Sequence, residues 1–188
     1  QMKGLTCVYC SDAGFANPIK SSVGGAFANS INTTVGSFDN PYVHWSADGY
    51  RLPTEGEWQY AASYKDGLTW TPFNYASGDT APWDTSTTID YYCWHSITMV
   101  HNVGGKLPNL LGIYDMSGNA WEWCWDWWDD YPTDTSNYRG SENYYCRVMR
   151  GGGCDSAISS MKVGNRHYLS PYYGYEGGNT GLRLAKNN

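Results

Sequence analysis

Tryptophan occupies every second position from residue 121 to residue 127, and this alternation constrains the fold more than any other feature of the chain. Side chains at positions i and i+2 lie on the same face of a β-strand, whereas a helix repeats about every 3.6 residues. A Ser-Gly-Asn sequence at 117–119 precedes the alternation and is typical of a turn. The pattern therefore predicts a turn followed by a strand with one face covered by indole rings.

A short helix is predicted to begin after Thr54. The Thr54 hydroxyl can accept a hydrogen bond from the first helical turn, while Glu57 can reach back to the backbone N–H of Thr54. Trp58, Ala61 and Ala62 then share one face at helical spacing. Because small alanines let a helix approach its neighbour closely, we expect this element to have a structural role.

The rest of the chain carries the signals of short strands and ordered loops. The 188 residues include 22 glycines, and only 16% of all residues are charged. We expect loops and short strands over 1–49, and a long ordered excursion over 65–108 that aromatic side chains pin in place. Further short strands are predicted at 146–153, ending at glycines, and at 181–185. A chain of this length suits one globular domain over 1–188.

The charge of the chain argues against several classes of partner. The formal net charge is -6, and no basic stripe of the kind that binds a phosphate backbone is present. We therefore expect no nucleic-acid partner and no attraction to an anionic membrane surface. No apolar run approaches the ~18 residues that a membrane span needs, and the first residues have no signal-peptide pattern. Membrane attachment is expected only through an anchor absent from this chain.

Six cysteines leave the redox state open. They stand at positions 7, 10, 93, 124, 146 and 154, an even number that permits disulfides in an oxidising compartment, with a pairing that spacing alone does not give. Cys7 and Cys10 have the spacing of half a zinc site, but no second Cys or His pair completes four ligands. Burial or a local disulfide is the preferred interpretation of this pair.

Four phrases in the chain occur in the order of a known family. They read Gly49-Tyr-Arg-Leu-Pro-Thr-Glu-Gly-Glu-Trp58, Gly112-Ile-Tyr-Asp-Met-Ser-Gly-Asn-Ala-Trp-Glu-Trp123, Arg147-Val-Met-Arg-Gly-Gly152 and Gly181-Leu-Arg-Leu184. Over about residues 47 to 185 the chain resembles the formylglycine-generating-enzyme (sulfatase-modifying factor) family. The resemblance implies an α+β C-type lectin fold of the formylglycine-generating-enzyme type, with few helices, small twisted antiparallel sheets and much ordered loop.

The resemblance also identifies where catalytic members carry a pair of cysteines five residues apart. Ser156 and Met161 stand at those positions in this chain, and neither supplies the thiolate that binds Cu(I) and performs sulfur redox chemistry. Cys154 lies two residues earlier and is expected to be buried as a small hydrophobe. We therefore expect a non-catalytic protein. The alternatives are a formylglycine-generating or related sulfatase-modifying oxidase and a purely structural envelope domain.

The chain is similar to one branch of this superfamily, the variable proteins of diversity-generating retroelements. That similarity implies a receptor- or adhesin-like protein, on the cell surface or secreted, whose variable region at about 150–184 binds a protein or other macromolecule. Tyrosines interspersed with small residues suit such a surface, although they can also be ordinary core residues. The candidate ligand-binding residues are Asp155, Ser156, Ala157, Ser159, Ser160, His167, Tyr168, Leu169, Ser170, Tyr172, Tyr173, Tyr175, Glu176 and Gly177.

One further candidate site follows from the resemblance. Residues 115–122 correspond to a calcium loop of the enzymatic relatives, in which Asp115 and Glu122 would supply carboxylates and Gly118 and Ala120 backbone carbonyls. Hard oxygen ligands at this spacing suit Ca²⁺. The alternative is a tight turn whose acidic side chains only satisfy backbone donors. Beyond this structural Ca²⁺, no cofactor is expected to be required.

Overall fold

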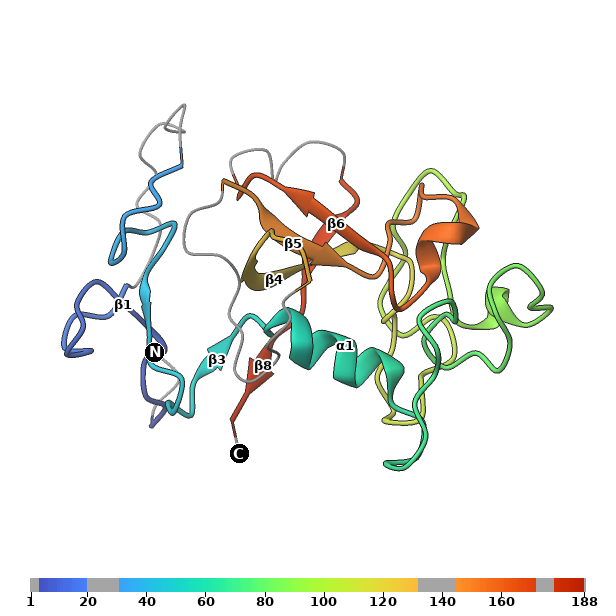
Figure 1. Cartoon of the computed structure of the whole chain (residues 1–188), viewed down its shortest axis with the longest axis horizontal. Helices are drawn as coiled ribbons and strands as arrows, with labels where there is room; N and C mark the ends of the chain where they lie inside the picture. The colour runs from blue at the N-terminus through green and yellow to red at the C-terminus, as the bar shows by residue number, and fades with distance from the viewer. Residues whose placement is uncertain (1–3, 20–30, 132–144, 172–177, 188) are drawn as a thin grey trace.

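A four-stranded mixed sheet forms the centre of the computed structural model, which describes residues 4–19, 31–131, 145–171 and 178–187 (Figure 1). Its strands lie in the order β6 (Arg166–Leu169), β5 (Arg147–Arg150), β4 (Trp121–Trp127) and β7 (Thr180–Leu182). β5 is antiparallel to both of its neighbours, and β7 runs parallel to β4. The sheet therefore brings together residues from both ends of the segment between β5 and β7.

Strand β4 confirms the prediction from the tryptophan alternation, and its two faces differ in burial. Glu122, Cys124 and Asp126 are buried, whereas Trp121, Trp123 and Trp125 are half-buried. The face that packs into the core is thus the one with two carboxylates. This is possible because each buried acid has hydrogen-bond partners: for example, Glu122 accepts from the Trp58 indole at 2.8 Å.

Helix α1 (Glu55–Ser63) begins as its sequence predicts. The Thr54 hydroxyl accepts from the backbone N–H of Glu57 at 3.2 Å, and the Glu57 carboxylate accepts from the backbone N–H of Thr54 at 2.8 Å. Trp58 and Ala62 are buried and pack in one cluster with Met116, Cys124, Val148 and Val163. Figure 1 shows the helix running across one side of the sheet. Trp58 and Ala62 are the buried helix residues that pack against that side.

Two short strand pairs lie outside the central sheet. β1 (Tyr9–Cys10) pairs with β2 (Tyr42–Val43), which agrees with the loops and short strands expected at the start of the chain. β3 (Tyr50–Arg51) pairs with β8 (Ala185–Lys186). The strand expected at 181–185 is therefore two strands, β7 and β8, which pair with different partners.

The region between α1 and β4 is long and irregular, as expected. Its only helical element among the described residues is the short 3-10 helix η1 (Ile89–Tyr91). Ala76, Ile89 and Cys93 are buried there and form a second cluster with Met161. Figure 1 shows these loops gathered at one end of the sheet, next to the 3-10 helix η2 (Ile158–Met161).

The segment after β5 is more regular than the sequence indicates. It lacks an apolar alternation, yet residues 166–169 form β6, in which Val148 is opposite Tyr168 and Met149 is opposite His167. β6 lies at the edge of the sheet, and its burial changes from half-buried to exposed and back without a period of two. Backbone pairing with β5, rather than side-chain burial, defines this strand, so the sequence carries no pattern for it.

A buried cluster of charges joins the helix to three strands of the sheet. The Glu55 carboxylate binds the Arg166 guanidinium through two hydrogen bonds, of 2.6 and 2.8 Å, and its Oε1 lies 3.4 Å from Nε of Arg150. The backbone N–H of Glu55 donates to Asp126 at 2.6 Å. Arg150 is fully buried, and Arg166 is largely buried. Two guanidinium groups and two carboxylates thus balance one another where α1, β4, β5 and β6 meet.

All six cysteines are free thiols in the structure. Among the described residues, no group of three or more His, Cys, Asp and Glu side chains is placed to hold a metal ion. Within the same ranges, none of the helices has the length and apolar character needed to cross a bilayer. The buried thiols are those of Cys10, Cys93, Cys124 and Cys154, and the half-buried ones are those of Cys7 and Cys146.

Replacing Glu55 tests the importance of the charge cluster. We expect Glu55→Gln to lower the free energy of unfolding by about 3–5 kcal/mol, because the substitution leaves two buried guanidinium groups without their shared carboxylate. Urea denaturation followed by tryptophan fluorescence measures the change.

Asp90→Asn is the matched control for this substitution. The Asp90 carboxylate is exposed and contacts His95 at the surface, while Lys106 donates to the Asp90 backbone carbonyl, which the substitution keeps. Loss of the carboxylate should therefore change stability by no more than about 0.5 kcal/mol. Equal effects of the two substitutions would show that the cluster has no special role.

Candidate functional site

A glycine turn separates the buried strand β5 from the segment that carries the candidate ligand-binding residues. Gly152 has a φ of +84°, and a Cβ placed there would lie 2.5 Å from the Met161 side chain and 3.0 Å from the Ser160 carbonyl oxygen. A Cβ at Gly153 would lie 2.9 Å from the Trp121 indole. Glycine is required at this turn because the following segment folds back tightly over the sheet.

Inward-facing residues of this segment belong to the core. Cys154, Met161 and Val163 are each at most 2% exposed. The carbonyl oxygens of Val163 and Asn165 accept hydrogen bonds from the buried guanidinium of Arg150. The backbone N–H of Val163 also bonds to the Tyr75 carbonyl at 2.7 Å. The path of the segment is therefore set by its apolar anchors and by main-chain hydrogen bonds.

The candidate ligand-binding residues that the structure describes lie on the outside of these anchors. None of them is buried: four are exposed, among them Tyr168 with 48% of its surface accessible, and the others are half-buried. We call this group the display surface. It consists of Asp155, Ser156, Ala157, Ser159, Ser160, His167, Tyr168, Leu169 and Ser170.

The other candidates lie outside the described residues. These are Tyr172, Tyr173, Tyr175, Glu176 and Gly177. The segment that contains them is bounded by two described residues, Pro171 and Gly178.

Two tryptophans from β4 and its end support the display surface. The rings of Trp121 and His167 are 5.0 Å apart, and those of Trp128 and Tyr168 are 4.7 Å apart. His167 and Tyr168 also contact each other, with 5.7 Å between ring centroids. These tryptophans were not among the residues predicted for the site. The position of Trp121 on the indole face of the predicted strand was the only signal for its role.

Polar contacts position the remaining parts of the surface. Asn179, beside β7, donates to the Asp155 carboxylate at 2.7 Å, so the two ends of the variable region meet there. The Ser156 hydroxyl accepts from the backbone N–H of Gly153 at 3.2 Å, and the Ser156 carbonyl accepts from the backbone N–H of Ser96. Asn165 donates to the Ser160 carbonyl. The serines are thus held in turns whose backbone is fixed.

Ser156 and Met161, which stand at the positions of the cysteine pair of catalytic relatives, have surroundings that differ from each other. Met161 is fully buried in the second core cluster, and Ser156 lies in the turn described above. The nearby Cys154 is 2% exposed, and burial raises the pKa of its thiol. A buried thiol with a raised pKa is a poor nucleophile and a poor Cu(I) ligand at neutral pH.

The predicted calcium loop offers one free carboxylate oxygen. Asp115 has a φ of +55°; its Oδ2 accepts from the backbone N–H of Gly104 at 2.7 Å, while its Oδ1 is buried without a hydrogen-bond partner. Glu122, in contrast, binds Arg183 through both oxygens at 2.7 and 2.9 Å and also accepts from Trp58. Asp115 therefore fits a cation ligand, whereas Glu122 is engaged by a cationic side chain.

The sequence of the chain matches one family model and several curated proteins. The family model for the sulfatase-modifying factor enzyme 1-like domain matches residues 9–188, a longer stretch than the four sequence phrases cover. The chain is 33% identical over 168 residues to the formylglycine-generating enzyme of Thermomonospora curvata, covering 77% of this chain and 51% of that enzyme. It is also 33% identical over 144 residues to chaperone protein LppX of Paenibacillus barcinonensis, covering 66% and 48% of the two chains. The chain thus spans about half the length of these curated relatives.

The chain is also similar to proteins of known structure. Treponema denticola variable protein 1 is 30% identical to this chain and superposes with a TM-score of 0.76, over 97% of this chain and 63% of that one. PvdO from Pseudomonas aeruginosa is 27% identical and superposes with a TM-score of 0.56, over 74% of this chain and 53% of that one.

The burial of Cys154 leads to an expected order of thiol reactivity. With iodoacetamide at neutral pH, we expect the half-buried Cys7 and Cys146 of the native protein to be alkylated at least about ten-fold faster than Cys154. Burial raises the pKa of Cys154 and of Cys146, so the rates of both should increase as the pH rises above the ordinary thiol range, and the accessibility of each sulfur sets the order between them. Peptide mapping by mass spectrometry measures each rate. Fast labelling of Cys154 at neutral pH would indicate an accessible thiolate and contradict this account.

Proposed function

Because the chain belongs to the sulfatase-modifying factor enzyme 1-like domain family, we propose that it uses this scaffold to bind a ligand rather than to perform catalysis. One observation carries the proposal. Between β5 and β6, buried anchors such as Cys154, Met161 and Val163 fix the backbone, and the residues of the display surface between them stay exposed or half-buried. Such an arrangement lets outward side chains change at little cost to folding, since surface substitutions usually alter stability by less than about 0.5 kcal/mol.

The fold agrees with the one implied by the sequence resemblance. It is an α+β C-type lectin fold of the formylglycine-generating-enzyme type, with few helices and small sheets. Similarity to Treponema denticola variable protein 1 supports a role as a variable protein. In this proposal, a diversity-generating retroelement alters the display surface and the candidate residues at 172–177, while the framework around them stays constant.

The absence of catalysis is part of the same proposal. Ser156 and Met161 replace the cysteine pair of the enzymatic relatives, and the two thiols nearby, Cys154 and Cys93, are both buried. A hydroxyl and a thioether do not supply the thiolate that sulfur oxidation requires. The rival function, a formylglycine-generating or related oxidase, would have to use a different group from those at these positions.

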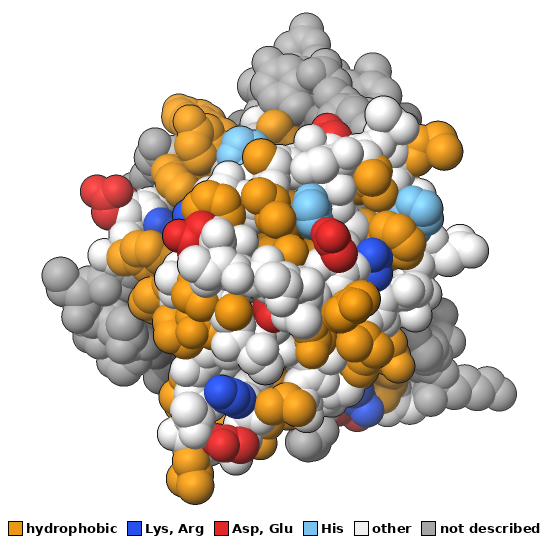
Figure 2. Space-filling model, turned by 90° about the vertical axis from the view of Figure 1, so that its right-hand side faces the viewer, with side chains coloured by type: hydrophobic (Ala, Val, Ile, Leu, Met, Phe, Trp, Pro, Cys, Tyr) orange, Lys and Arg blue, Asp and Glu red, His pale blue; other side chains and the backbone are white. Residues whose placement is uncertain are grey.

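The chemistry of the display surface favours a protein or other macromolecular ligand. Tyr168 and His167 lie against Trp128 and Trp121 and offer broad ring faces at low side-chain entropy. Figure 2 shows the face at the right of Figure 1, where basic side chains are scattered among apolar and neutral ones instead of forming a stripe. This distribution disfavours a phosphate backbone as ligand. From the similarity to a variable protein, we propose that the protein acts on the cell surface or outside the cell.

Two libraries test whether folding and recognition are separated. One randomises the positions of the display surface and the other randomises the buried positions Cys154, Met161 and Val163. We expect most members of the first library to fold and to yield binders against an immobilised protein such as lysozyme. Most members of the second should fail to fold, because truncating a buried Met alone costs about 2–5 kcal/mol. Cell-surface display with a conformation-dependent readout and target selection measures both properties.

Two outcomes would overturn the proposal. Equal loss of folding in both libraries would show that the display residues are structural. Conversion of a sulfatase-type cysteine peptide to formylglycine in a copper-supplemented assay, lost in Cys154→Ala but kept in Cys146→Ala, would establish the oxidase instead.

We also propose that the 115–122 loop binds Ca²⁺ at its Asp115 end. The unpartnered, buried Oδ1 of Asp115 supports this proposal. The backbone carbonyls of Gly118 and Ala120 would be the further oxygen ligands, and the Gly118 carbonyl also accepts from the backbone N–H of Ala120 at 2.9 Å. Glu122 would join only by giving up a hydrogen bond to Arg183. The ion would order the loop and would have no part in chemistry.

Calcium binding is expected to raise the melting temperature of the protein. One millimolar Ca²⁺ at about ten times the dissociation constant would stabilise the native state by roughly 1.4 kcal/mol. Differential scanning calorimetry with and without EGTA measures the shift, and Asp115→Asn should remove it. An unchanged melting temperature in wild-type protein would identify the loop as a plain turn.

A further inference from the structure

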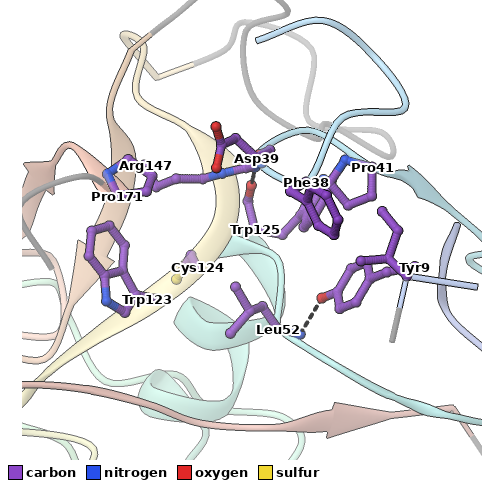
Figure 3. A pocket seen from close by; sticks show the side chains of 11 residues that line it. Tyr9, Phe38, Asp39, Pro41, Leu52, Trp123, Cys124, Trp125, Arg147 and Pro171 are labelled. Carbon is purple, nitrogen blue, oxygen red and sulfur yellow. Dashed lines mark hydrogen bonds between the residues drawn. The ribbon is translucent and has the colours of Figure 1, made fainter. Parts of the chain in front are cut away.

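A cavity of about 390 Å³ lies between the indole face of β4 and the segments that precede α1 (Figure 3). Its size is that of a small-molecule site. The rings of Tyr9, Phe38, Trp123 and Trp125 form much of its wall. The remaining lining residues are Ile19, Asp39, Pro41, Leu52, Cys124, Arg147 and Pro171. Because these residues come from distant parts of the sequence, only the folded chain brings them together.

The cavity has donors without matching acceptors. The Tyr9 oxygen accepts from the backbone N–H of Leu52 at 2.8 Å, and among the described residues no acceptor takes the Tyr9 hydroxyl proton. Arg147 donates to the backbone carbonyls of Asp39, at 2.8 Å, and of Trp125. A guanidinium has five N–H donors, so these two bonds leave others available.

The guanidinium of Arg147 is buried, since only 5% of the residue is exposed. Its guanidinium stacks on the rings of Trp125 and Trp127, and within the described part of the chain no carboxylate forms an ion pair with it. The carboxylates of Asp39 and Asp126 act on it only through space. Burial lowers the pKa of Arg147 to about 10, so the group still carries its charge at neutral pH. Figure 3 shows its side chain along the upper wall of the cavity, between Pro171 and Asp39.

We propose that this cavity binds a small organic anion with an apolar body and a single carboxylate or sulfonate. The body would occupy the space between the aromatic walls, and the acidic group would accept from Arg147 and Tyr9. A neutral hydrocarbon would leave both donors unpaired, and an inorganic anion would leave the aromatic walls uncovered. The site lies beside the display surface, since Pro171 follows Ser170, but its ring walls belong to the framework. The proposal therefore does not depend on the proposed function.

An aryl sulfonate dye provides the probe. Titration of the full chain with 8-anilinonaphthalene-1-sulfonate should give a saturable fluorescence increase with one site per chain. 3-Phenylpropionate should displace the dye, whereas 3-phenylpropionamide, which has the same body without the charge, should displace it at least about ten-fold less well. A tetrapeptide that ends in a free phenylalanine carboxylate distinguishes the source of the anion: displacement identifies a chain end as acceptable, and failure identifies a free small acid.

Matched substitutions locate the site. Phe38 and Phe73 are both exposed, at 59% and 66%, but only Phe38 lines the cavity. We expect Phe38→Ala to weaken dye and phenylpropionate binding several-fold and Phe73→Ala to leave it unchanged. Tyr9→Phe removes one donor and should weaken phenylpropionate by roughly three- to ten-fold. Leu52→Trp should fill the cavity and abolish binding.

The result that would overturn the proposal is specific. It fails if the amide competes as well as the acid, or if Phe38→Ala and Tyr9→Phe both bind phenylpropionate like the wild type. Arg147 is left intact in these variants because it also holds the Trp125 and Asp39 carbonyls. Melting temperatures of Phe38→Ala and Tyr9→Phe confirm that each variant is folded.

Discussion

The shared carboxylate of Glu55 is the interaction on which the rest of the structure depends. It binds Arg166 of β6 and lies against Arg150 of β5, while its own backbone N–H binds Asp126 of β4. A buried ion cluster of this kind adds little net stability compared with an apolar core, but removing one member is costly. Its contribution here is geometric. The edge strand that carries His167 and Tyr168 has a single position relative to α1, whatever those two side chains are.

The sequence predicted some elements of the fold and not others, depending on whether the signal for an element lies within a few neighbouring residues. The capping residues of α1 and the alternation in β4 are contained within a few residues each, so the sequence shows them directly. β6 has no such signal, because it is an edge strand held by its backbone. The division of the chain end into β7 and β8 depends on which partner each strand meets, and that is a property of the whole fold.

The candidate site likewise contains residues that the sequence identified and residues that it did not. Resemblance identified the outward residues such as Asp155 and Tyr168, and the structure leaves them accessible. Sequence reasoning did not identify the rings beneath them, Trp121 and Trp128, because a tryptophan on a strand can serve the core equally well. The apolar cavity was also missed. Tyr9, Leu52 and Arg147 are far apart in the chain, and no local pattern connects them.

The parallel pairing of β7 with β4 has a consequence for the length of the variable region. β5 and β7 flank the same strand, so the segment between them begins and ends on one fixed support. The entropic cost of closing a flexible loop between fixed ends grows only with the logarithm of its length, by about 0.6 kcal/mol for each doubling. The described residues on either side of positions 172–177, Pro171 and Gly178, lie close to β6 and β7 of one sheet. We therefore expect a change in the number of residues between them to leave that sheet intact.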